Sequence, residues 1–151
     1  MRIGIDFGGT KIEAAAIDAE GAFAARFRVP TPVDYDGALQ AVRGLIERVE
    51  RETGPLGQVG IGIPGSASPR SGRIRNSNTV YLNGRTFAAD LERLLRRGVR
   101  LANDANCFAI SEAVDGAGHG ARTVFAAILG TGCGGGVVVD GRLVEGRSGV
   151  A

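Results

Sequence analysis

The sequence predicts an α/β fold with a mixed sheet, followed by the first strands of a second, similar domain. Its 151 residues suffice for one domain with a real core and part of another. Segments with strand patterns alternate with segments of helical periodicity. A hairpin with a glycine-threonine turn occurs twice, as "IGIDFGGTKIEAAAIDAEG" and "FAAILGTGCGGGVVVDG". This repetition indicates a duplicated architecture, although glycine turns also join unrelated hairpins. We predict one domain over residues 1–117 and the incomplete start of a second over residues 118–151.

The first three segments are predicted to be strands. Residues 2–7 have the apolar character of a buried strand. Residues 12–17 are rich in alanine, which favours helix, but the segment is short and turn residues follow it. We therefore interpret it as the second strand of a hairpin. Residues 23–29 alternate between apolar and polar side chains, as a half-buried strand does, and prolines end the segment.

Helices and strands alternate in the middle of the chain. Asp34 or Asp36 can cap a helix that ends at Gly54. One apolar face of that helix is formed by Leu39, Val42, Ile46 and Val49. A strand over residues 58–63 precedes a loop rich in Ser, Asn and Gly that runs to about residue 85. A second helix is expected to end near Gly98 and is marked by Phe87, Leu91, Leu94 and Leu95.

A short strand over residues 99–102 leads into a third helix, over residues 105–114, with Asn103-Asp104 as its cap. This helix packs either Phe108 and Ile110 or Ala109 and Ala113. Residues 115–121 are rich in glycine and are typical of a domain junction. Strands are expected over residues 123–129 and 136–140, joined by the densest glycine loop in the chain.

Composition excludes several classes of protein. The net charge of +2 gives no electrostatic footprint for nucleic acid, and we expect Arg96-Arg97 to lie at a solvated helix end. No apolar run is long enough for a membrane span, and Asp6 interrupts the stretch where a signal peptide would be apolar. Cys107 and Cys133 lack metal-type spacing. We therefore predict a reduced, cytoplasmic protein with neither nucleic acid nor membrane as its partner.

Glycine is the outlier in the composition. The chain has 25 glycines, against about 10 expected at an average usage of roughly 7%. Consecutive N–H groups in a glycine turn can form an anion nest, and a threonine hydroxyl adds a donor. Two such hairpins facing each other would hold one polyphosphate from both sides. The Walker order fails at Gly9-Thr10-Lys11, and the dinucleotide spacing at residues 130–135 is followed by a β-branched strand rather than a helix.

Two carboxylates are candidates for chemistry. Asp6 ends an apolar strand, where a carboxylate is costly unless it is solvated, paired or holding a cation such as hydrated Mg²⁺. A hydrogen bond within the turn is the simpler role for Asp6. Asp104 lies at a helix start, which stabilises its negative charge. From there it can accept a proton from a bound hydroxyl, and helix capping alone is its simpler role.

The ordered set "IDFGGTK", "GIGIPG", "NDANCFAISEA" and "LGTGCGGG" resembles the sugar kinases of the ROK (repressor, open reading frame, kinase) family over essentially the whole chain. The resemblance is strongest to the bacterial fructokinases, or manno(fructo)kinases, of that family. It is carried by "RVPTPVDYDGAL", "GIPGSASPRSGRIRNSNTVYLNGRTF" and "RLANDANCFAISEAVDGA". It implies an actin-like ATPase fold of the ribonuclease H-like type, with two related α/β domains and a cleft between them.

The resemblance also implies roles for individual residues. Asp6 would help to organise Mg²⁺ and water. The first phosphate loop for ATP would be formed by Gly8, Gly9, Thr10 and Lys11. The second would be formed by Gly130, Thr131, Gly132 and Gly134. Asp104 would be the catalytic base, beside a sugar-binding Asn103. The sugar pocket would also be lined by Gly65, Ser66 and Asn78.

The implied activity is transfer of the γ-phosphoryl group of ATP to the 6-hydroxyl of a hexose. Fructose is the first choice, and N-acetylglucosamine or glucose is the alternative. A non-catalytic nucleotide- or sugar-binding fragment is a further alternative. A repressor of the same family ranks lower, because Met1 leads straight into the first strand and leaves no room for a DNA-binding domain.

The sequence departs from the fructokinase pattern in two places. Tyr81 stands where these fructokinases usually carry tryptophan. The chain also ends at Ala151, before the family's Gly-Glu-x-x-Gly-His segment and its cysteine-rich zinc site. We therefore expect Zn²⁺ only beyond Ala151, no turnover by this chain alone, and a homodimer for the complete protein.

Overall fold

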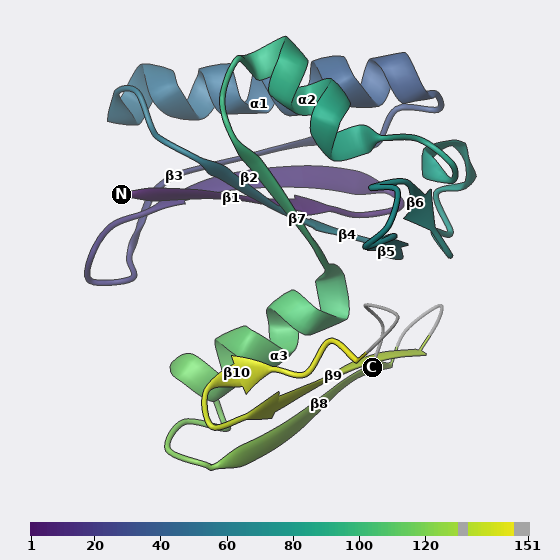
Figure 1. Ribbon diagram of the computed structural model, residues 1–151. Coiled ribbons are helices and arrows are strands. Elements are labelled where there is room, and N and C mark those ends of the chain that lie inside the picture. Colours follow the sequence, from purple (N-terminus) through teal and green to yellow (C-terminus); the bar gives the residue numbers. More distant parts are fainter. Residues whose placement is uncertain (130–132, 147–151) are drawn as a thin grey trace. The chain divides into compact units, whose positions relative to one another are not determined.

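The computed structural model describes residues 1–129 and 133–146 (Figure 1). By compactness the chain divides into two units, Met1–Ala102 and Asn103–Ala151. In the ranges that the structure describes, no helix has both the length and the apolar character that crossing a membrane requires. Each unit is described separately below.

A five-stranded sheet forms the centre of the first unit, in the order β3-β2-β1-β4-β7. Its strands are β1 (Arg2–Phe7), β2 (Lys11–Ile17), β3 (Phe23–Pro30), β4 (Val59–Ile63) and β7 (Val99–Asn103). β1, β2 and β3 form an antiparallel meander, whereas β1 and β4 run parallel. The sheet is therefore mixed, as predicted. Residues 12–17 are confirmed as the second strand of the hairpin.

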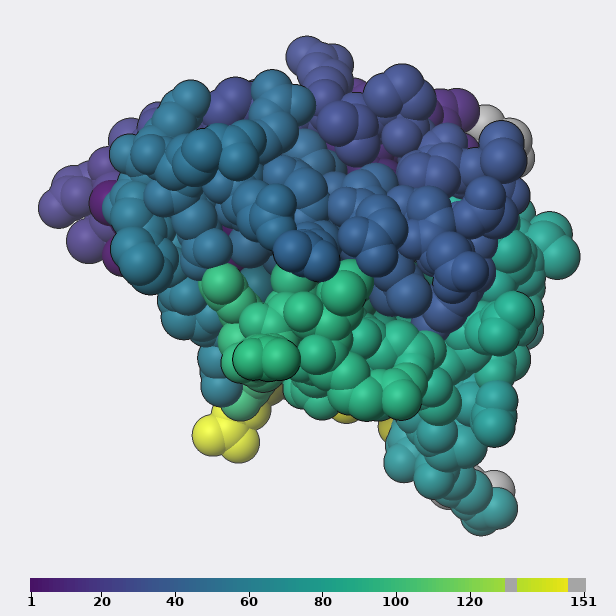
Figure 2. All heavy atoms as spheres, turned by 90° about the horizontal axis from the view of Figure 1, so that it is seen from above, coloured from purple at the N-terminus to yellow at the C-terminus, as the bar shows by residue number. Residues whose placement is uncertain are grey.

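Two helices, α1 (Tyr35–Thr53) and α2 (Phe87–Leu95), cover one face of this sheet (Figure 1). Seen from above, their atoms lie side by side (Figure 2). Asp34 is the N-cap of α1, and its carboxylate accepts a hydrogen bond from the Gly37 N–H at 2.7 Å. Of the two predicted N-caps, Asp34 and Asp36, the structure therefore selects Asp34. α2 ends earlier than expected, because Arg96 takes the left-handed conformation at its C-cap.

The core of the first unit lies between the sheet and these helices. Its largest fully buried side chains include Phe7, Ile12, Leu45, Ile46, Ile61 and Phe87. The expectation of a wholly buried first strand is wrong, because exposed and buried residues alternate along β1. The helices cover only one face of the sheet, so Gly4 and Asp6 lie on the other. Phe23 is 60% exposed because it begins β3 at the end of the hairpin.

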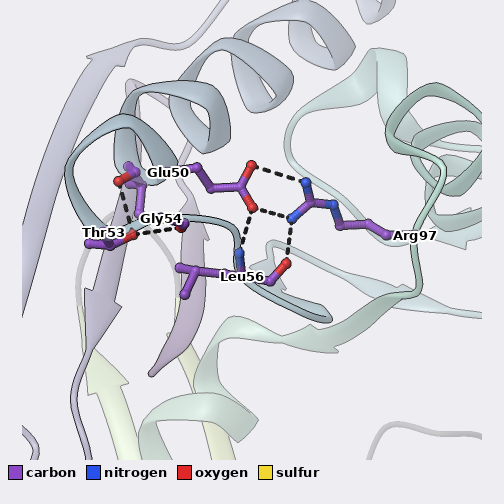
Figure 3. A network of polar contacts seen from close by, with 6 residues as sticks. Glu50, Thr53, Gly54, Leu56 and Arg97 are labelled. Atoms are coloured by element: carbon purple, nitrogen blue, oxygen red, sulfur yellow. Dashed lines mark hydrogen bonds and ion pairs between the residues drawn. The ribbon is translucent and has the colours of Figure 1, made fainter.

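The expectation of a solvated Arg96-Arg97 pair is wrong for Arg97. Its guanidinium donates to both carboxylate oxygens of Glu50, with N–O distances of 2.5 and 3.0 Å (Figure 3). It also donates to the Leu56 carbonyl at 2.9 Å, while the Leu56 N–H donates to Glu50. This network ties the end of α1 to the segment before β4 and to the turn after α2.

The loop expected between residues 64 and 85 contains more regular structure than its composition indicates. Strands β5 (Ser66–Ala67) and β6 (Ile74–Arg75) pair antiparallel, and a short 3₁₀ helix, η1 (Val80–Leu82), follows. Leu82 and Ile74 are buried in the core of the unit. The loop is therefore anchored by apolar side chains at both of its halves.

The second unit contains α3 (Asp104–Val114) and a three-stranded antiparallel sheet (Figure 1). Its strands are β8 (Thr123–Leu129), β9 (Cys133–Val139) and β10 (Arg142–Leu143), in the order β10-β9-β8. This is the same meander as β1, β2 and β3, so both copies of the predicted hairpin exist. α3 packs on β8 and β9 through buried Ala109, with Ala113 and Ile110 beside it, while Phe108 is 38% exposed.

This packing affects where the chain divides. The sequence placed the third helix in the first domain and the boundary after residue 117. By compactness, the division falls one element earlier, because α3 packs on the hairpin that follows it.

Candidate functional site

The proposed first phosphate loop is the turn between β1 and β2. The Gly8 N–H donates to the Lys11 carbonyl at 2.9 Å, which closes the turn. A Cβ at Gly8 would lie 2.8 Å from that carbonyl oxygen, so only glycine fits there. Gly9, Thr10 and Lys11 are exposed. The turn thus presents a hydroxyl and an ammonium group to solvent, as an anion-binding loop requires.

Asp6 lies on the exposed face of β1, opposite Glu13 in the β1–β2 register. The side chain of Arg26 forms an ion pair with Glu13 at 2.5 Å, which offsets part of the local negative charge. Within the described ranges, no three His, Cys, Asp or Glu side chains gather as a set of metal ligands. A hydrated Mg²⁺ keeps most of its waters and needs only one or two carboxylates, so one exposed carboxylate such as that of Asp6 is compatible with it, and the role of Asp6 stays a prediction.

Three of the residues assigned to the sugar pocket, Gly65, Ser66 and Asn78, lie in the first unit. Gly65 has φ of +86°, and a Cβ there would lie 2.5 Å from the Arg75 carbonyl oxygen and 2.8 Å from the Ser77 nitrogen. Only glycine allows this close approach, which brings Ser66 and the segment before Asn78 together. Ser66 is 4% exposed, and its hydroxyl has no hydrogen-bond partner among the described residues.

Two further residues shape this loop and were missed in the sequence. The Asn83 amide accepts from the Ser77 N–H and donates to the Ser77 carbonyl, both at 2.9 Å, so it fixes the backbone next to Asn78. Thr79 is 8% exposed, and in the described part of the chain its hydroxyl also lacks a hydrogen-bond partner. The run of Asn and Ser in "RNSNTVYLNG" was the available signal, but it does not distinguish a ligand-binding side chain from a loop-forming one.

Asn103 and Asp104 begin the second unit. Asn103 is the N-cap of α3, accepting from the Asn106 N–H at 3.2 Å and donating to Asp104 Oδ1 at 3.0 Å. The Ala105 N–H donates to the same Asp104 oxygen at 2.8 Å. Both contacts use Oδ1. The carboxylate is thus oriented through one oxygen, and the other can accept a proton.

The proposed second phosphate loop falls largely outside the described residues, which exclude Gly130, Thr131 and Gly132. Gly134 lies in β9 opposite Ile128. A Cβ at Gly134 would lie 3.1 Å from the Ala105 Cβ, and one at Gly136 would lie 2.7 Å from the Ala109 Cβ. This part of the glycine run therefore makes room for α3, a role that the sequence reasoning missed. A phosphate contact by Gly134 stays a prediction.

Sheet topology brings the two predicted sites of the first unit to one edge. β1 and β4 are parallel, with Asp6 opposite Gly62. The glycine turn follows the carboxyl end of β1, and Gly65 follows the carboxyl end of β4. Ligands in open α/β sheets bind outside the carboxyl ends of such strands. The turn and the loop over residues 64–85, called the polar loop below, thus follow neighbouring strand ends at one edge of the sheet.

Comparison with known proteins finds relatives among the sugar kinases. The chain is 46% identical over 149 residues to the N-acetyl-D-glucosamine kinase of Yersinia pseudotuberculosis serotype O:3 (strain YPIII), covering 98% of this chain and 49% of the relative. It is 43% identical to the N-acetylgalactosamine kinase AgaK of Shewanella sp. (strain ANA-3), covering 100% and 49%. The chain thus spans about half the length of the curated relatives it matches.

A solved structure shows the same fold. The ROK family glucokinase from Streptomyces griseus, in complex with glucose and AMPPNP, superposes with a TM-score of 0.90 at 33% identity, covering 99% of this chain and 48% of that one. This confirms the predicted actin-like α/β fold with its mixed sheet. The model of the ROK family matches residues 2–151. The chain therefore belongs to the ROK family.

Proposed function

We propose that this chain supplies the substrate-binding edge and the catalytic base of an ATP-dependent kinase that phosphorylates an N-acetylhexosamine, with N-acetylglucosamine as the first candidate. The observation that carries the proposal is the pairing, at two adjacent parallel strand ends, of an exposed glycine-threonine-lysine turn and a polar loop. The turn suits a phosphate group, and the polar loop suits a polyol.

The choice of sugar comes from the relatives. Two of them, at 46% and 43% identity, are named as kinases of N-acetylglucosamine and N-acetylgalactosamine. They favour the alternative in the sequence-based prediction over fructose, which was its first choice. Glucose is the second candidate, because a glucokinase that binds glucose superposes with a TM-score of 0.90.

The polar loop has hydrogen-bonding capacity that a sugar would use. The Ser66 and Thr79 hydroxyls are buried and lack a partner within the described residues. Leaving such a group unpaired costs about 1–3 kcal/mol. A bound sugar, directly or through an ordered water, would supply the missing partners and recover part of that cost.

In the proposed reaction, Asp104 Oδ2 accepts the proton of the sugar 6-hydroxyl while Oδ1 stays bonded to Asn103 and to the Ala105 N–H. These two contacts fix the direction of the carboxylate. Asn103 would hold a neighbouring sugar hydroxyl. General-base assistance of this kind contributes roughly 10²–10⁴-fold.

ATP enters as the second substrate, with its Mg²⁺. The Thr10 hydroxyl and the Lys11 ammonium would donate to its phosphates, and Asp6 would accept from water bound to the cation. When bound, Mg²⁺ would neutralise charge on the transferred phosphoryl group, whose transition state is loose. Positioning by these side chains therefore supplies most of the remaining catalysis.

The test uses the extended protein, meaning this chain continued beyond residue 151 to the length of its relatives. ADP release is measured with N-acetylglucosamine, N-acetylgalactosamine, glucose and fructose at matched concentrations. We expect the highest kcat/KM with N-acetylglucosamine. A highest value with fructose would contradict the choice of sugar, and ADP release with none of the four would contradict the kinase itself.

A further inference from the structure

The segment that follows β3 makes two hydrogen bonds to the proposed phosphate turn. The Thr31 hydroxyl donates to the Gly8 carbonyl at 2.7 Å, and the Thr31 N–H donates to the Thr10 carbonyl at 3.0 Å. Both acceptors belong to the turn between β1 and β2. Thr31 is partly buried, so these contacts are shielded from competing water.

The hydroxyl contact has a consequence for the N–H groups of the turn. A peptide unit is planar and trans, so its C=O and N–H point in opposite directions. Because Thr31 holds the Gly8 carbonyl, the N–H of Gly9 in the same peptide unit is directed away from Thr31. Gly9 is exposed and has no Cβ, so this N–H can reach a ligand. Thr31 thereby orients a donor without touching the ligand.

The same segment is tied to the polar loop on its other side. The Tyr81 hydroxyl donates to the Pro32 carbonyl at 2.8 Å. Burial raises the pKa of Tyr81, and the negative charge of Asp34 adds to this, so the hydroxyl remains a donor. Tyr81 lies in η1, which the Asn83–Ser77 contacts join to the backbone beside Asn78.

We propose that Thr31 is a positioning residue for nucleotide binding, and that the Thr31–Pro32 segment connects the phosphate turn to the sugar loop through Tyr81. The inference rests on the proposed function of the turn. Proline at residue 32 restricts the backbone of the segment, so that a constraint at Tyr81 is passed to Thr31 rather than lost in chain flexibility.

The primary test compares Thr31→Val with Thr31→Ser in the extended protein. Valine keeps the shape of the side chain and loses the hydroxyl, whereas serine keeps the donor. One uncharged hydrogen bond contributes about 0.5–1.5 kcal/mol, so we expect the KM for Mg-ATP to rise roughly 3- to 10-fold in Thr31→Val. The KM for the sugar should change less than about 2-fold, and Thr31→Ser should restore most of the nucleotide affinity.

A matched control is Thr53→Val. Thr53 also donates a side-chain hydrogen bond to a backbone carbonyl, that of Val49 at 3.0 Å, but it does so at the end of α1. Loss of this hydrogen bond in Thr53→Val should lower the unfolding free energy about as much as Thr31→Val does, and it should leave the KM values for Mg-ATP and for the sugar unchanged. Equal effects of the two variants on the KM for Mg-ATP would overturn the positioning role and indicate general destabilisation.

Tyr81→Phe keeps the proposal testable if Thr31→Val does not fold. It removes only the hydroxyl that holds Pro32, and we expect the KM for Mg-ATP to rise about 2- to 3-fold. Unchanged nucleotide KM in every folded Thr31 and Tyr81 variant, with an active parent protein, would defeat this inference alone. An inactive parent protein would instead defeat the proposed function.

Discussion

Replacing Arg97 with glutamine is expected to destabilise the first unit by about 2 kcal/mol. Arg97 makes a bidentate contact with Glu50 at 2.5 and 3.0 Å and a third hydrogen bond to the Leu56 carbonyl. Hydrogen bonds to charged groups contribute roughly 1.5–3 kcal/mol, and bidentate geometry favours the stronger end of that range. The side chains are 25% and 17% exposed, and Glu50 keeps its bond from the Leu56 N–H, so we take a middle value.

The assay is urea unfolding followed by tyrosine fluorescence. The sequence contains 2 tyrosines and 0 tryptophans. Tyr35 and Tyr81 both lie in the first unit, so the signal reports on that unit alone. With a urea slope of about 1–3 kcal/mol/M, a loss of about 2 kcal/mol lowers the midpoint by roughly 1 M.

The matched control for this prediction is Arg43→Gln. Arg43 pairs with Glu47 at 2.7 Å on the surface of α1, where the two side chains are 48% and 50% exposed. Exposed pairs at this spacing contribute about 0.3–0.5 kcal/mol. If Arg97→Gln lowers stability no more than Arg43→Gln does, the reasoning that assigns a structural role to the Glu50–Arg97 network is refuted.

The same network predicts a pH dependence. The hydrogen bond from Arg97 lowers the pKa of Glu50 below its ordinary value of 4.5, burial opposes this, and the Leu56 N–H adds to the lowering. A carboxylate with a depressed folded-state pKa contributes stability that is present above its unfolded-state pKa and is lost as the pH falls through the folded-state value. The difference in unfolding free energy between the parent chain and Arg97→Gln should therefore shrink below about pH 4.5. A difference in unfolding free energy that stays constant down to pH 2 would contradict this prediction.

Three further predictions follow from the second unit and the phosphate loops. Gly136→Ala should destabilise the second unit by about 1–3 kcal/mol, because the added Cβ at residue 136 would lie 2.7 Å from the Ala109 Cβ. Hydrogen exchange should show faster exchange of the β9 amides in this variant. Thr10→Val and Thr131→Val should each weaken Mg-ATP binding more than sugar binding, by about 1.5–3 kcal/mol in calorimetric titration. Unchanged Mg-ATP affinity in both variants would contradict the proposal that the two glycine-threonine loops hold the phosphates from both sides. The 151-residue chain alone should show no sugar-dependent ADP release.

The elements that the sequence predicted well have strong local signals. Asp34 fixes the start of α1 because an N-cap acts within its own first turn, and Gly54 fixes its end. The hairpin of β1 and β2 follows from an apolar run, a glycine turn and a second run. By contrast, β5 and β6 contain two residues each, too few for a period to show.

The features that the sequence did not predict depend on contacts between distant residues. Arg97 and Glu50 are 47 positions apart, and Tyr81 and Pro32 are 49 apart. No periodicity or spacing indicates either pair. The glycine run that contains Gly134 and Gly136 was interpreted as a phosphate loop. In the structure these two glycines make room for α3, and this packing depends on residues distant in the sequence. The residues of the candidate site came from the resemblance to the family and stay a prediction, whereas the sequence carries no signal for the residues that hold them in place.

The most direct test of the kinase proposal is the turnover of Asp104→Asn in the extended protein, with N-acetylglucosamine and Mg-ATP as substrates. The substitution keeps the size of the side chain and an oxygen that can accept from the Ala105 N–H, but it removes the carboxylate that takes the proton. We predict that kcat falls by about 10²–10⁴-fold while the dissociation constant of the sugar changes little. A variant that retains near-normal kcat would contradict the role of Asp104 as the catalytic base.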